Sequence, residues 1–93
     1  MSTRRYDSVW DALEDRPGVA ENLKIRSVLM QELTAFVTST RMTQKEAAER
    51  FGVTQPRISD LMRGKIDLFS IDTLVNMLTA AGLHVDLRVR NAG

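Results

Sequence analysis

Apolar residues recur at helical spacing along most of this chain. From residue 19 to residue 39 this spacing predicts one long amphipathic helix, whose apolar positions are Ala20, Leu23, Val28, Leu29, Leu33, Phe36 and Val37. Three shorter helices are predicted over residues 44–51, 55–63 and 71–81. The pattern therefore indicates a helical bundle rather than a sheet.

Suitable capping residues precede each of the short helices. Thr43 precedes the first, and Glu46 stands three residues later, as in a capping box. Thr54 and Ser70 precede the other two. Gly52 follows the first short helix, where a glycine can adopt the positive φ that ends a helix sharply. Residues 44–63 therefore have the dimensions of two helices joined by a tight turn.

Strict alternation of apolar and polar residues begins at residue 83 and predicts a β-strand. Its apolar face would consist of Leu83, Val85, Leu87 and Val89. One strand needs a partner, which is either the segment Ser8–Trp10 or the same strand of a second copy. We therefore predict a homodimer that uses this strand. Residues 6–15 are compatible with a helical turn or an extended arm.

The expected fold class is an all-α bundle of about five helices with a short C-terminal β-strand. We divide the chain into an N-terminal arm or short helix (1–18), a helical domain (19–82) and a C-terminal strand and tail (83–93). At 93 residues the chain has room for one compact domain.

Composition excludes several kinds of chemistry. The chain has no cysteine and a single histidine, so we expect no disulfide, no metal site and no cofactor. No nucleophile–base constellation is recognisable, so we expect no enzymatic activity. No run of 18 apolar residues and no signal peptide is present, so we expect no membrane association and a cytoplasmic, nucleoid-associated location.

Charge is uneven along the chain although the net charge is only +1. Residues 41–66 contain six basic and three acidic residues, a local net charge of +3, whereas residues 1–40 and 67–93 each sum to −1. The six basic residues bracket the two short helices: Arg41, Lys45, Arg50, Arg57, Arg63 and Lys65. Cations in this arrangement suit the phosphates that flank a DNA major groove.

The second helix of the pair carries a polar face that is typical of base recognition. Because Ile58, Leu61 and Met62 form its inward stripe, the other side chains are left for an outer face. Glutamine can pair with adenine, arginine with guanine, serine with either, and aspartate with the cytosine amino group. Proline can contact a thymine methyl. The candidate base contacts are Gln55, Pro56, Arg57, Ser59 and Asp60.

The segment TQKEAAERFGVTQPRISDLMRG, residues 43–64, resembles the helix-turn-helix of Cro and λ repressor, the XRE type. The resemblance implies double-stranded DNA as partner, with Gln44 on a phosphate and the start of the second helix in the major groove. The complete set of expected phosphate contacts is Arg41, Thr43, Gln44, Lys45, Thr54, Arg63 and Lys65. Pro56 and Asp60 depart from the usual groove residues, and Asp60 must face a cytosine or be held by Arg57 or Arg63.

A narrower resemblance extends over nearly the whole chain. The long first helix, the run GKIDLFSIDTLVNMLTAAGLHVDLRV and an N-terminal V-W-x-x-L element are similar to the HigA-like antitoxins. This implies a dimeric repressor of its own operon on a palindromic operator. The alternative is an antitoxin whose main role is to neutralise a small basic, RelE-like or HigB-like RNA-cleaving toxin. The acidic segment 6–15 would then provide the contact surface.

Overall fold

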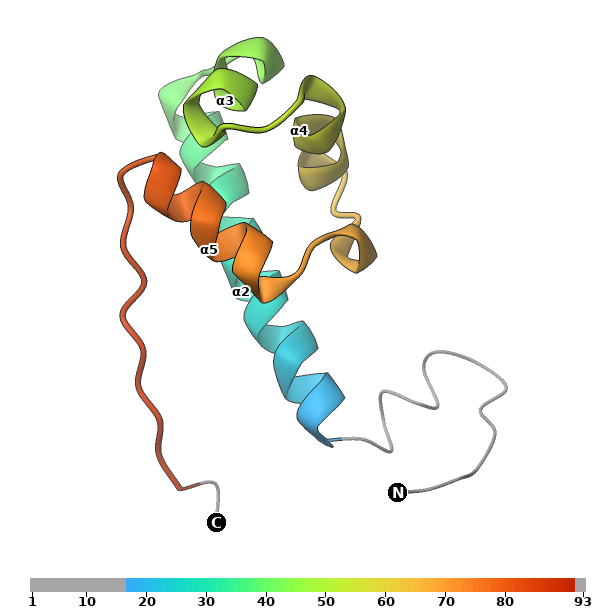
Figure 1. Cartoon of the computed structure of the whole chain (residues 1–93), viewed down its shortest axis with the longest axis vertical. Helices are drawn as coiled ribbons and strands as arrows, with labels where there is room; N and C mark the ends of the chain where they lie inside the picture. The colour runs from blue at the N-terminus through green and yellow to red at the C-terminus, as the bar shows by residue number, and fades with distance from the viewer. Residues whose placement is uncertain (1–16, 92–93) are drawn as a thin grey trace, which may run out of the picture.

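The computed structural model describes residues 17–91. These residues form a helical bundle in which α5 packs across the long helix α2, while α3 and α4 lie together near the C-terminal end of α2 (Figure 1). The elements are α2 (Pro17–Thr40), α3 (Gln44–Phe51), α4 (Gln55–Met62), the 3-10 turn η1 (Ile66–Leu68) and α5 (Ile71–Ala80). None of these helices is long and apolar enough to cross a membrane.

The ends of the helices follow from the capping residues. The Thr43 hydroxyl accepts a hydrogen bond from the Glu46 amide at 3.1 Å, and the Glu46 carboxylate accepts one from the Thr43 amide at 2.9 Å, which confirms the capping box. Gly52 ends α3 with a φ of 72°, as expected for a left-handed stop. Thr54 and Ser70 cap α4 and α5 in the same way as Thr43, by accepting a backbone N–H bond three residues later.

The core is made by all four helices and by the loop before α5. Its largest fully buried side chains, all below 2% exposed, come from α2, α4, this loop and α5: Leu33, Ile58, Leu61, Phe69, Leu74 and Met77. Phe69 stands in a segment for which the sequence predicted only a loop. Val28 had been counted with the apolar face of α2, but its side chain is 50% exposed.

Two expectations about secondary structure are corrected. We expected about five helices, but residues 17–91 contain four α-helices and η1. We also expected a strand over 83–90, but these residues are extended without a ladder in the described single chain. A strand requires hydrogen bonds from a neighbouring backbone, which the alternating pattern cannot supply by itself. Residues 1–16 of the predicted N-terminal arm, including the partner segment Ser8–Trp10, lie outside the described residues, and Pro17 and Gly18 belong to α2.

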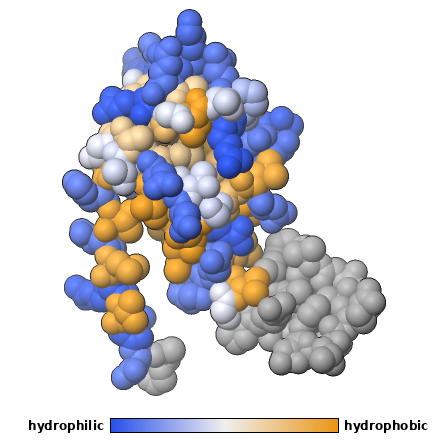
Figure 2. Space-filling view, viewed as in Figure 1, coloured by the Kyte–Doolittle hydropathy of each residue, from blue (hydrophilic) through white to orange (hydrophobic). Residues whose placement is uncertain are grey.

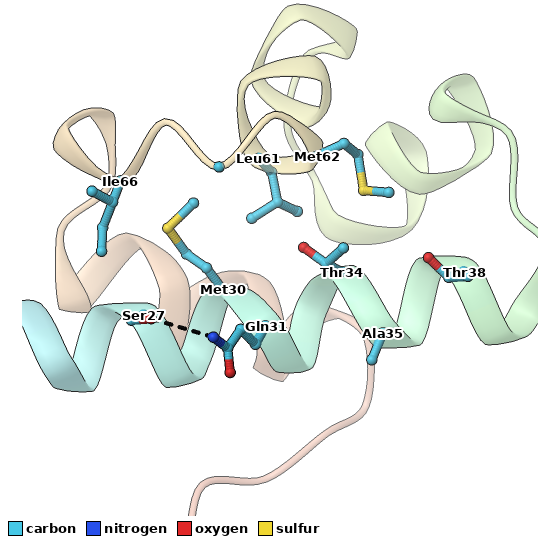
Figure 3. Close-up of a pocket in the computed structure, with 10 residues that line it drawn as sticks. Ser27, Met30, Gln31, Thr34, Ala35, Thr38, Leu61, Met62 and Ile66 are labelled. Atoms are coloured by element: carbon cyan, nitrogen blue, oxygen red, sulfur yellow. Dashed lines mark hydrogen bonds between the residues drawn. The ribbon is translucent and has the colours of Figure 1, made fainter.

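A groove of about 530 Å³ separates α2 from the end of α4 and from η1. Leu61 and Met62 on α4 point toward Met30 and Thr34 on α2, and Ile66 of η1 borders the same groove (Figure 3). Ile58 and Leu61 are buried in the core, so close packing holds α4 there, whereas Met62 at its end is only partly buried beside the groove.

Candidate nucleic-acid interface

Helices α3 and α4, with the three residues Gly52–Thr54 between them, form the predicted helix-turn-helix. Buried Ala47, Ala48 and Phe51 anchor α3 in the core, and buried Ile58 and Leu61 anchor α4. The polar side of each helix therefore faces away from the core.

Thr43 and Thr54 each accept one first-turn backbone N–H, and Pro56 has none. The N–H groups of Gln44 and Lys45 in α3 and of Gln55 in α4 are left for an approaching phosphate, which the partial positive charge of the helix N-termini also favours.

The predicted contact residues differ in exposure. The first turns of the two helices and the basic residues beside them are exposed: Arg41, Thr43, Gln44, Lys45, Thr54, Gln55, Pro56, Arg63 and Lys65. Arg57, Ser59 and Asp60 are half-buried. Thr54, Pro56, Arg57 and Asp60 border one shallow hollow of about 420 Å³ together with Val53. The structure thus brings most of the predicted base-contact face together at one end of α4.

The guanidinium of Arg57 is bound to other parts of the protein, whereas a side chain free to enter a DNA groove would extend toward solvent. Its guanidinium donates a hydrogen bond to the Leu68 carbonyl at 2.9 Å. The guanidinium carbon also lies 4.7 Å from the centre of the Phe69 ring, in cation–π geometry. Base contact by Arg57 remains a prediction, and it would require the side chain to leave both partners.

Arg50 is also used inside the fold. Its guanidinium donates to the Ala81 carbonyl at 3.0 Å and lies 5.6 Å from the centre of the Phe36 ring. It therefore ties the last turn of α3 to the end of α5 and satisfies a carbonyl that the helix leaves without a partner. Two of the six basic residues of the motif thus serve the fold, although sequence charge alone counts all six toward a DNA surface.

Asp60 forms an ion pair with a residue that the sequence analysis did not consider for it. The Lys65 ammonium lies 3.6 Å from an Asp60 carboxylate oxygen, and both side chains are partly exposed. A pair of this kind contributes at most about 1 kcal/mol, so the lysine can exchange it for a phosphate. The structure therefore holds the acid at the groove face with Lys65, rather than with Arg57 or Arg63.

Arg41 has an unusual backbone conformation. It follows α2 with a φ of 58°, in the left-handed region that glycine favours, and its side chain is exposed. A residue with a Cβ costs about 1–2 kcal/mol there. A cation at this strained position, two residues before Thr43, is consistent with a phosphate contact beside the start of α3.

The comparisons with known proteins agree with this geometry. A family model described as a helix-turn-helix domain matches residues 12–90. A solved structure that is provisionally named an XRE-family transcriptional regulator is 32% identical, with a TM-score of 0.72 over 77% of this chain and 81% of that chain. The chain belongs to the XRE-type helix-turn-helix family. Comparison with curated proteins gave no match.

Membership of the XRE type assigns a general class of function. Helix-turn-helix proteins of this type are DNA-binding regulators and are typically not enzymes. The matched region extends well beyond the motif and includes the long helix α2 and most of the extended tail. The family therefore accounts for the whole described bundle of this XRE-type protein, not only for α3 and α4.

One arginine outside the motif was missed by the sequence analysis. Arg26 on α2 is half-buried, and its guanidinium donates to the carbonyls of Ile66 and Phe69 at 3.2 and 3.3 Å. These partners lie 40 and 43 residues further along the chain. No local spacing could have indicated a contact that depends on the tertiary structure.

Proposed function

We propose that this XRE-type protein is a sequence-specific transcriptional repressor that binds a palindromic operator as a homodimer and controls its own operon in the cytoplasm. The observation that carries the proposal is the first turn of α4, where Gln55 and Pro56 are exposed after the cap Thr54, together with the exposed, capped first turn of α3. In this arrangement α4 enters the major groove, while Gln44, Lys45 and Arg63 contact the phosphates on its two sides.

The extended tail supports the dimer. The side chains of Leu87 and Val89 are 80% and 86% exposed, a large apolar exposure for a single chain. Figure 2 shows the tail as a ridge on which hydrophobic and hydrophilic residues alternate. We infer that two tails pair as antiparallel strands across a two-fold axis and bury Val85, Leu87 and Val89 against each other. Leu83, which was predicted for the same contact, is partly buried against the core of its own chain. Two α4 helices about 34 Å apart would then contact successive major grooves.

The proposal is tested by selecting binding sites for the full chain from random double-stranded DNA. We expect one enriched site with two inverted half-sites. The variant Gln55→Ala should lose about 1–3 kcal/mol of binding free energy and lose its preference at one base pair in each half-site, because glutamine pairs bidentately with adenine. Gln31→Ala is the matched control, since Gln31 is an exposed glutamine on α2 outside the motif. Failure to enrich any sequence would contradict the proposal.

A second candidate function is the neutralisation of a protein toxin. Residues 6–15 contain four acidic residues and no basic one, which suits a small basic RNA-cleaving partner. This segment lies outside the described residues. The test is co-expression with the product of the neighbouring gene. If the full chain restores growth and a chain with Asp7, Asp11, Glu14 and Asp15 changed to Asn or Gln does not, the candidate function and its surface are supported.

A further inference from the structure

We infer that Arg26 and Arg57 form a clamp that positions α4 for base recognition, and that Arg57 is a positioning residue rather than a base contact. The inference rests on the proposed DNA-binding function, which it deepens. The two arginines come from different helices, α2 and α4, and their guanidinium groups meet the same four-residue segment, Ile66–Phe69.

The geometry of the clamp is defined by three backbone carbonyls. Arg57 donates to the Leu68 carbonyl at 2.9 Å, and Arg26 donates to those of Ile66 and Phe69 at 3.2 and 3.3 Å. Both arginines border one pocket of about 460 Å³ together with this segment. The segment is therefore held from two sides by charged donors, and it connects α2 to α4 indirectly.

Phe69 makes the clamp rigid. Its ring is 1% exposed and belongs to the core, so the segment cannot shift without disturbing the packing of α2 and α5. The Arg57 guanidinium lies on this ring at 4.7 Å from its centre. Asn22 accepts a hydrogen bond from the Arg26 Nε at 2.7 Å, which fixes the other guanidinium. Each guanidinium thus has two kinds of partner that favour the orientation seen here.

The groove explains why such a clamp is needed. On the side facing α2, Leu61 is buried in the core, and beyond it the end of α4 borders an open groove of about 530 Å³ (Figure 3). Base contacts require their helix to be held within about 0.5 Å and 10–20°. Side-chain packing along the groove restrains the end of α4 only in part. The hydrogen bonds of the two arginines add a further restraint on the position of this helix.

The same geometry argues against base contact by Arg57. A guanidinium on Leu68 and Phe69 would have to give up a charge-assisted hydrogen bond and a cation–π contact before it could reach guanine. Gln55 and Pro56 stand on the same helix, are exposed and need no such release. They therefore suit direct contact with the bases, and Arg57 suits holding the helix that carries them.

The test compares operator binding by Arg26→Met, Arg57→Met and the double variant with operator binding by the unchanged protein. Methionine keeps an unbranched aliphatic side chain, which at position 57 can still cover the Phe69 ring, and it removes the donors. We expect each single variant to bind the selected operator about tenfold more weakly. The preference at every base pair and the slope of log K against log salt should stay unchanged. The double variant should be no weaker than the weaker of the two single variants, because either change opens the same clamp.

Three outcomes would overturn the clamp. A preference lost at one base pair in Arg57→Met would make Arg57 a base contact. A shallower salt slope would make it a phosphate contact, as expected for the control Lys45→Met. If Arg26→Met folds and binds the operator as tightly as the unchanged protein does, Arg26 does not position α4. If Arg57→Met does not fold, the result for Arg26→Met alone tests the clamp.

A measurement without DNA separates this inference from the proposed function. Amide hydrogen exchange should become faster in α4 in both single variants and remain unchanged in α3, whose capping box the clamp does not touch. If the unchanged protein selects no DNA sequence, the proposed function fails. If the amide hydrogens of α4 exchange in both single variants at the rate of the unchanged protein, the clamp is overturned, whatever the DNA-binding measurements give.

Discussion

Operator binding by this protein is expected to weaken about a thousandfold when the salt concentration rises from about 50 to about 200 mM. Arg41, Lys45 and Arg63 are exposed at the proposed interface, and a dimer presents each of them twice. Each cation that neutralises a phosphate releases a counterion, so the slope of log K against log salt should be about −5. Fluorescence anisotropy of labelled operator over a salt series measures it.

Single substitutions show which residues contribute to the slope of log K against log salt. Lys45→Ala should make the slope shallower by about 2 in a dimer and weaken all DNA sequences alike. Lys24→Ala is the matched control, because Lys24 is an exposed lysine on α2 outside the motif. A slope near zero for the unchanged protein, or an equal effect of both lysine variants, would contradict the proposed phosphate contacts.

Arg41→Gly separates binding from folding within the same experiment. The substitution removes a cation, so the salt slope should become shallower, as in Lys45→Ala. It also places glycine at a φ of 58°, where glycine is unstrained, so the free energy of unfolding should stay constant or rise by up to about 1 kcal/mol. Thermal unfolding together with anisotropy checks both parts.

Removing the apolar face of the tail is expected to convert the dimer to a monomer and to weaken operator binding at least about a hundredfold. The double variant Leu87→Ser, Val89→Ser exchanges two strongly exposed apolar side chains for polar ones. A monomer loses the second half-site, and with it the gain from binding two linked sites at once. Light scattering measures the oligomeric state, and anisotropy measures the affinity.

The matched control uses the opposite face of the same segment. Arg88 and Arg90 alternate with Leu87 and Val89, so in a paired strand they would point away from the apolar face. Arg88→Ser, Arg90→Ser should therefore leave the dimer intact. If the unchanged protein is a monomer at all concentrations, or if both double variants dissociate equally, the tail is not the dimer contact.

The helix-turn-helix was predictable because its determinants are local. The capping box at Thr43 and Glu46 acts over four residues, and Gly52 needs only its own freedom of φ. The predicted bounds of α3 therefore agree with the structure, and those of α4 and α5 differ by one residue at their ends. The spacing of apolar residues also predicted the inward side of α4, where Ile58 and Leu61 are buried and Met62 is partly buried.

The loop before α5 and the roles of the arginines were not predictable in this way. Residues 65–69 contain no periodic pattern long enough to indicate η1, and the burial of Phe69 depends on α2 and α5. Arg50 and Arg57 look in the sequence like the other cations of the motif. Their different roles come from the carbonyls of Ala81 and Leu68, which lie 31 and 11 residues away.

The sequence by itself determined the order of the helices, their caps, the family and the basic segment around the motif, because each of these depends on neighbouring residues or on short spacings. Only the tertiary structure decided which arginines are free to meet DNA, how Asp60 is held, that Val28 is exposed, and that the tail has no strand partner within the described chain. Most of these features depend on groups far apart in the chain, which only folding brings within hydrogen-bonding or packing distance. Lys65 is five residues from Asp60, but only the path of the chain after α4 decides that this cation, rather than Arg57 or Arg63, meets the carboxylate.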